Sequence, residues 1–87
     1  MINIKDIVDS AIQANIADYK ELVFKYNRYG RWADDTSNKK DARNYQEMSW
    51  GYLCEFNQIK KTLVRIFPDQ EQYINDKLIQ ARVSLNK

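Results

Sequence analysis

The side chains best suited to binding another molecule lie between residues 25 and 43. Arginines there are interleaved with aromatic rings, an arrangement that suits phosphate contact plus stacking on a base and also suits the anchor positions of protein interfaces. A purely structural interpretation stands beside these two: Tyr26 and Tyr29 would close a core, and the cations would favour a helix C-terminus. The candidate partner-binding residues are Arg28, Tyr29, Arg31, Trp32, Lys39, Lys40 and Arg43.

Charge is concentrated in the same segment. The whole chain of 87 residues carries a net charge of only +2. Residues 25–43 hold six Lys and Arg against three Asp and therefore sum to +3, whereas residues 1–24 sum to −2. An anionic partner would be drawn to residues 25–43. The three acids, Asp34, Asp35 and Asp41, dilute this charge, and we expect a protein partner in preference to nucleic acid.

Catalytic and metal-binding patterns are missing from the sequence. There is no histidine and one cysteine, Cys54, so neither an imidazole-based catalytic site nor a Cys/His zinc site can be assembled. The two glycines, Gly30 and Gly51, do not form a phosphate-binding loop. Cys54 has no strong base near it in sequence and is interpreted as a structural or partly exposed thiol. We expect no enzyme activity, no cofactor and no metal.

Composition also bears on location. A single cysteine fits a reducing compartment, and the first residues, Met-Ile-Asn-Ile-Lys-Asp, lack the apolar run of a signal peptide or membrane span. We therefore expect a cytoplasmic protein that does not enter a membrane. Asn, Ile and Lys supply 26 of the 87 residues, a bias typical of A/T-rich genomes. Short chains of this kind are common among phage accessory proteins, for which the location would be the host cytoplasm.

An apolar stripe indicates the longest element. Its members are spaced 3, 4, 4, 3, 4 and 3 residues apart, which keeps them on one face of an α-helix. We expect this helix to run over about residues 38–67 and to end at Pro68, because proline disfavours helix in the residue before it. The stripe consists of Tyr45, Met48, Tyr52, Phe56, Ile59, Leu63 and Ile66.

Two further helices flank it. Asn3 is the expected N-cap of a helix over about residues 4–29, with Ile2 packed on Ile7, and Gly30 is the expected C-terminal residue with positive φ. Residues 30–38 would form the loop. Asp69 would cap a third helix over about residues 70–85, whose core stripe is Ile74, Leu78, Ala81 and Leu85. The fold class is therefore all-α, a single domain with an antiparallel hairpin of two long amphipathic helices plus a shorter third helix.

Apolar side chains also lie away from these stripes, and a small three-helix bundle has only one core to hold them. We expect a second interface, used for self-association or for a partner. Its residues are Phe24, Trp50, Leu53, Val64, Ile79 and Val83. Asn15 lies on the apolar face of the first helix. It therefore needs a partner, either in another copy or in a neighbouring backbone carbonyl or water.

These observations favour a non-enzymatic helical interaction protein that binds and regulates or inhibits a protein partner, for example a phage or mobile-element protein acting on a host or defence component. The alternative is a nucleic-acid or nucleotide-binding protein that uses residues 25–43. A third class, a structural assembly subunit, would share the second interface without needing the exposed Arg and Trp residues.

Overall fold

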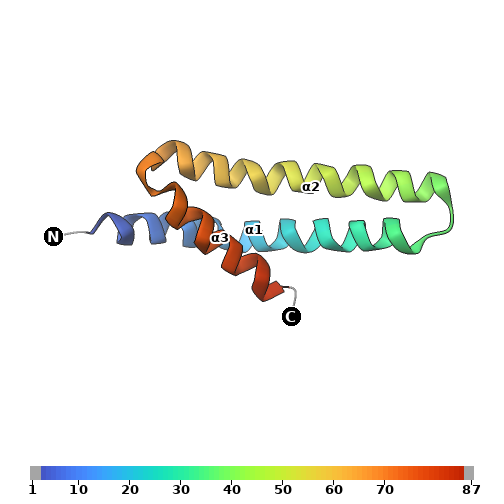
Figure 1. Cartoon of the computed structure of the whole chain (residues 1–87), viewed down its shortest axis with the longest axis horizontal. Helices are drawn as coiled ribbons and strands as arrows, with labels where there is room; N and C mark the ends of the chain where they lie inside the picture. Colours follow the sequence, from blue (N-terminus) through green and yellow to red (C-terminus); the bar gives the residue numbers. More distant parts are fainter. Residues whose placement is uncertain (1–2, 86–87) are drawn as a thin grey trace.

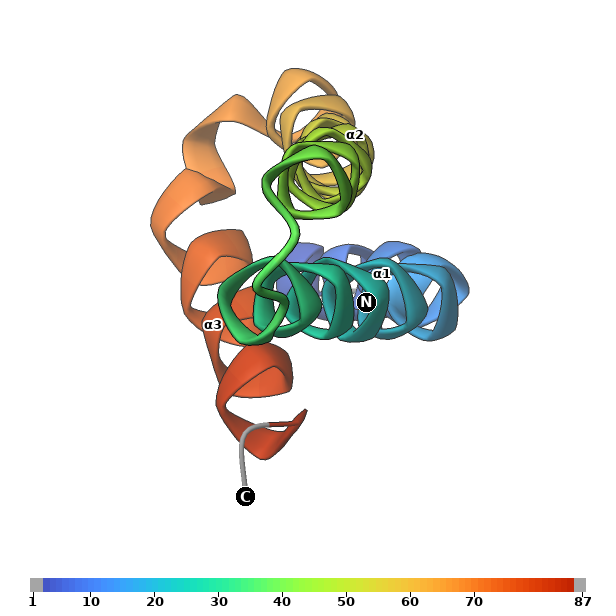
Figure 2. The ribbon, with the colours of Figure 1, turned by 90° about the vertical axis from the view of Figure 1, so that its right-hand side faces the viewer.

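The computed structural model describes residues 3–85 and consists of helices joined by short connections (Figure 1). Helix α1 spans Ile4–Asp35, α2 spans Lys39–Ile66, and α3 spans Glu71–Leu85, preceded by a short 3₁₀ turn, η1, at Pro68–Gln70. The long helices α1 and α2 run antiparallel as a hairpin, and the shorter α3 crosses one side of it (Figures 1 and 2). The all-α prediction with three helices is confirmed.

Local caps set where the helices begin. The Asn3 side chain accepts a hydrogen bond from the Lys5 backbone N–H at 3.0 Å, as expected for an N-cap. At the start of α2, Asn38 accepts from the backbone N–H groups of Lys40 and Asp41 at 2.9 and 3.2 Å. The predicted contact of Ile2 with Ile7 lies outside the described residues.

The end of α1 differs from the prediction. The helix does not stop at residue 29 but continues through Gly30 to Asp35, and the predicted loop 30–38 shrinks to residues 36–38. No glycine in residues 3–85 has a positive φ, so Gly30 does not act as a left-handed helix end. Glycine inside a helix costs about 1 kcal/mol relative to alanine. Ring contacts of Trp32 with Tyr29 and Tyr45, which require the extra helical turn, offset this cost.

The core is built from all three helices. Phe56 and Leu63 of α2 are buried, as predicted from the apolar stripe. Met48 and Ile66, predicted as core, are instead 44% and 60% exposed. They lie 18 residues, or about five turns, apart and so occupy one edge of α2, which neither α1 nor α3 covers. The buried apolar residues are Val8, Ile12, Tyr19, Val23, Phe56, Leu63, Ile74, Leu78 and Ala81.

Helix α3 follows its predicted stripe but begins differently. Ile74, Leu78 and Ala81 are buried and Leu85 packs partly against them. Asp69, expected to cap this helix, lies inside η1, because Pro68 starts a 3₁₀ turn closed by the Gln70 N–H bonding to the Phe67 carbonyl at 3.0 Å. This turn reverses the chain and directs α3 back across the hairpin (Figure 1).

Candidate binding surface at the tip of the hairpin

The helical course of α1 through residue 35 decides how the basic and aromatic residues are arranged. Phe24, Arg28 and Trp32 are spaced four residues apart and therefore lie in one row along the helix. The Arg28 guanidinium carbon lies 4.5 Å from the Phe24 ring centroid and 5.8 Å from the Trp32 ring centroid. We call these three residues the Arg28 stack. Phe24 and Trp32 remain 47% and 43% exposed, so the stack lies on the surface.

A second group of rings holds Trp32 in place. Tyr29 stacks on Tyr52 with ring centroids 5.6 Å apart and rings inclined by 19°. Trp32 meets Tyr29 and Tyr45 edge-on at 5.2 and 5.6 Å. We call Tyr29, Tyr45 and Tyr52 the tyrosine cluster. Because the tyrosine cluster joins α1 to α2, it holds the Trp32 ring in place, and this ring remains 43% exposed.

The structural interpretation of the tyrosines holds in part. Tyr26 meets the buried Phe56 ring edge-on at 5.5 Å and so contributes to the core. Tyr29 instead packs on Tyr52 and Tyr45, near the tip of the hairpin where α1 connects to α2. The cations also lie differently from the expectation, since the last turn of α1 contains no basic residue once the helix ends at Asp35.

The remaining predicted cations are not gathered into the Arg28 stack. Arg43 pairs with Glu47 at 3.5 Å. Lys39 and Lys40 are exposed in the first turn of α2. Arg31 lines a different hollow of about 410 Å³, together with Asp34, Tyr26, Asn27, Gly30 and Ser49. The structure therefore unites Arg28 with Trp32 and places Tyr29 beside them, while the other four cations occupy separate positions.

The predicted second interface is divided among several surfaces. Leu53 and Val64 pack partly against the core, which the sequence pattern did not anticipate. Phe24 belongs to the Arg28 stack. Trp50, Ile79 and Val83 are each more than half exposed, on α2 and on α3. Near the open end of the hairpin, Ile66, which was predicted as core, is exposed, and so are Ile4 and Ile7 of α1.

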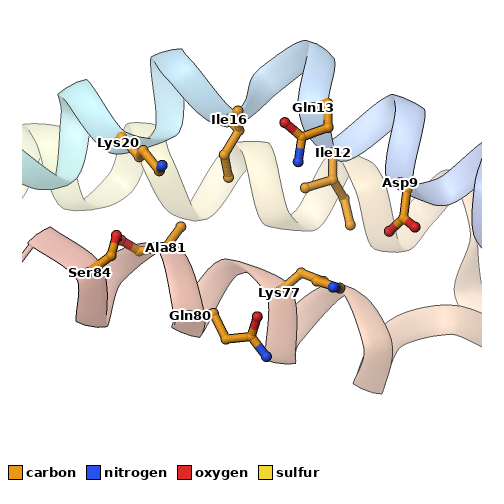
Figure 3. A pocket seen from close by; sticks show the side chains of 9 residues that line it. All are labelled: Asp9, Ile12, Gln13, Ile16, Lys20, Lys77, Gln80, Ala81 and Ser84. Carbon is orange, nitrogen blue, oxygen red and sulfur yellow. The ribbon is translucent and has the colours of Figure 1, made fainter.

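A groove between α1 and α3 is the other concave feature. Its volume is about 430 Å³, and side chains from both helices project into it (Figure 3). Near it the Tyr73 hydroxyl of α3 donates a hydrogen bond to the Asp9 carboxylate of α1 at 2.5 Å. That bond raises the pKa of Tyr73 above its ordinary value, with smaller contributions from burial and from the charges of Asp9 and Asp6. The lining residues are Asp9, Ile12, Gln13, Ile16, Lys20, Lys77, Gln80, Ala81 and Ser84.

The described residues 3–85 offer neither a metal site nor a membrane-spanning helix. No group of three or more Cys, Asp or Glu side chains is placed to hold a metal ion. None of the helices described is both long enough and apolar enough to cross a bilayer. Cys54 is an exposed free thiol on α2.

Comparison with known proteins adds no assignment: no family model matches the chain, and neither a curated protein nor a solved structure matches it significantly.

Proposed function

We propose that this chain is a non-enzymatic interaction protein that binds and regulates or inhibits a protein partner through the tip of its helical hairpin. The observation that carries this proposal is the Arg28 stack, in which two exposed rings and an arginine are already ordered before any partner arrives. Aromatic and arginine side chains dominate the energetics of protein interfaces. Ordering them in advance reduces the entropy lost on binding.

The distribution of charge supports a protein partner over nucleic acid. Two of the six cations in residues 25–43 are already paired with carboxylates, Lys25 with Glu21 at 3.3 Å and Arg43 with Glu47. Asp34, Asp35 and Asp41 lie exposed among the rest. A surface that binds a phosphate backbone depends on several unpaired cations acting together. The composition bias towards Asn, Ile and Lys supports an origin in a phage or mobile element, with action in the host cytoplasm.

We also propose that the protein associates with itself. Nine large hydrophobic side chains within residues 3–85 are at least 43% exposed, and they occur on all three helices. A second copy is the proposed cover for part of these side chains, because burial of exposed apolar surface is favourable. The nine are Ile4, Ile7, Phe24, Trp32, Met48, Trp50, Ile66, Ile79 and Val83.

The experiment that tests partner binding is affinity capture from the native host with the wild type and with the double variant Arg28→Ala/Trp32→Ala. We expect a specific protein to be retained by the wild type and lost by the double variant. Arg65→Ala is the matched control, because Arg65 is an exposed arginine at the opposite end of α2. Circular dichroism shows whether each variant keeps its helices.

The nucleic-acid alternative is tested on the same proteins with generic DNA and RNA oligonucleotides over a range of salt. We expect dissociation constants no tighter than about 10⁻⁴ M at physiological salt, the weak end of non-specific binding. Affinity in the nanomolar to low micromolar range, with a steep salt dependence that the double variant reduces, would overturn the proposed protein partner.

A further inference from the structure

Within residues 3–85, no carboxylate forms an ion pair with Arg28. Among the described residues, its contacts are the rings of Phe24 and Trp32, whereas Lys25 and Arg43 each pair with a glutamate. An aromatic ring attracts the cation but does not replace a carboxylate as acceptor for the five guanidinium N–H donors. Arg28 is therefore a positioned cation whose donors are available to an anionic ligand.

The residues above and below the stack restrict what that anion can be. Glu21 and Asp35 lie seven residues before and after Arg28. Seven residues are close to two helical turns, so both acids lie in nearly the same row as Arg28, about 10 Å away on either side. Both are exposed. Because Glu21 is already paired with Lys25, a chain of phosphates or a run of acidic residues along this row would meet like charge chiefly at Asp35, whereas a single carboxylate bound at Arg28 would not.

The surroundings of the stack favour apolar neighbours for that carboxylate. The Arg28 guanidinium carbon lies 4.5 Å from the Phe24 ring centroid and 5.8 Å from the Trp32 ring centroid, so the two rings are no more than about 10 Å apart with Arg28 between them. A hollow of about 310 Å³ adjoins Trp32 and is lined by Trp32, Asp35, Thr36 and Tyr45. The Trp32 and Tyr45 rings of this hollow suit an apolar side chain next to the one that reaches Arg28.

We propose that Arg28 binds one Asp or Glu carboxylate in a linear segment of the protein partner, and that apolar residues flanking this carboxylate lie on Phe24 and Trp32. This inference rests on the proposed function, since it specifies the chemistry of the partner at the same surface. The pairing is attractive because arginine and carboxylate form two parallel hydrogen bonds and because the rings hold the guanidinium in place beforehand.

A random library of twelve-residue peptides displayed on phage is the probe, with the purified full chain immobilised. We expect the retained peptides to share a single Asp or Glu with apolar neighbours. For a retained peptide, Arg28→Gln should lower the affinity about 10-fold or more, since hydrogen bonds to charged groups contribute about 1.5–3 kcal/mol. Arg65→Gln should leave it unchanged. Replacing the peptide acid by its amide should cause a similar loss, and the two changes together should cost less than their sum.

Three results would overturn the inference: no peptide retained, retained peptides without an acid, or binding insensitive to Arg28→Gln. Selection of peptides with runs of acids would overturn the role assigned to Asp35. Each of these leaves the proposed function standing if a host protein is still captured in a Trp32-dependent way. Tight, salt-dependent binding to oligonucleotides would overturn both.

Discussion

At the scale of single residues, Phe56 is the side chain on which the core depends most. It is fully buried, its ring meets the rings of Tyr19 and Tyr26 at 5.5 Å each, and the Arg82 guanidinium lies 5.3 Å from its centroid. These neighbours come from α1 and α3, so Phe56 of α2 joins all three helices. Loss of its ring would remove contacts that no other single residue replaces.

We expect Phe56→Ala to lower the free energy of unfolding by about 3–5 kcal/mol, the range for removing a buried aromatic ring. This is a large part of the stability of so small a protein. Urea denaturation followed by circular dichroism measures the change. A loss below about 1 kcal/mol would mean that the buried face of α2 has been misassigned.

Two polar residues show how the interior satisfies its hydrogen bonds. The Asn15 amide donates to the Ala11 carbonyl one turn earlier at 2.9 Å, so its partner is a local backbone carbonyl, one of the alternatives the sequence left open. Ser49 is buried, and its hydroxyl donates to the Tyr26 carbonyl at 3.1 Å, which links α2 to α1. Neither residue leaves a buried donor without a partner, which would cost about 1–3 kcal/mol.

At the scale of elements, Gly30 tests the continuity of α1. A Cβ added at Gly30 would lie 3.6 Å from the Ser49 hydroxyl oxygen, an ordinary van der Waals contact. We expect Gly30→Ala to raise the free energy of unfolding by about 0.5–1 kcal/mol, because alanine is favoured over glycine inside a helix. Gly51→Ala is the matched comparison, since nothing lies within 4 Å of a Cβ there. Destabilisation by Gly30→Ala, measured by urea denaturation, would indicate that the helix ends at residue 30.

The docking of α3 on α1 should weaken at alkaline pH. Donation to Asp9 raises the pKa of Tyr73 in the folded protein above its ordinary value of 10.0. A raised pKa means that the bond contributes stability below pH 10, the value for the unfolded chain, and that this contribution is lost as the pH rises through the folded value. Deprotonation removes the donor and places a phenolate beside the Asp9 carboxylate.

Titration of the tyrosine absorbance is the measurement for this prediction. Tyr73→Phe should remove the highest-pH component attributable to this residue, and Asp9→Asn should shift that component to lower pH. Thermal unfolding across the same range should show a steeper alkaline decline for the wild type than for Tyr73→Phe. Equal declines in both proteins would show that the Asp9–Tyr73 bond does not hold α3 in place.

At the scale of the whole molecule, the shape explains why so much apolar surface is left. The molecule measures 58 × 25 × 18 Å, and α3, with 15 residues, is about half as long as α1 or α2. It crosses one side of the hairpin and leaves the tip and the opposite side to solvent (Figures 1 and 2). A second copy would cover surface that the third helix cannot reach.

We therefore expect a dimer or higher oligomer at micromolar concentration. Trp50→Lys combined with Val83→Lys should shift the protein towards monomer while preserving its helical circular dichroism, because both side chains are more than half exposed. Lysine at Leu53 would not serve, since Leu53 packs against the core. Light scattering measures the mass. A wild type that is strictly monomeric at ~100 μM, well above the dissociation constants of weak dimers, would contradict self-association but not binding of another protein.

Local chemistry explains why much of the fold could be predicted. Asn3 and Asn38 cap helices because their side chains reach backbone N–H groups two or three residues away. Pro68 ends α2 because the proline ring clashes with a helical backbone at the residue before it, Phe67. The row of Phe24, Arg28 and Trp32 was also within reach of sequence reasoning, since it needs only a four-residue spacing. It was missed because ending the first helix at residue 29 removed Trp32 from that helix.

The sequence by itself thus determined the helical class, the three elements, the Asn3 cap, and Phe56 and Leu63 as core, because these follow from periodicity and from contacts within a few residues. Only the tertiary structure decided that α1 continues past Gly30, because the extra turn lets Trp32 of α1 pack on Tyr45 of α2. It also decided that Met48 and Ile66 are exposed and that Tyr73 bonds to Asp9, 64 residues away. The exposure of Met48 and Ile66 and the bond from Tyr73 to Asp9 depend on which side of the hairpin α3 covers, and no local pattern specifies that choice.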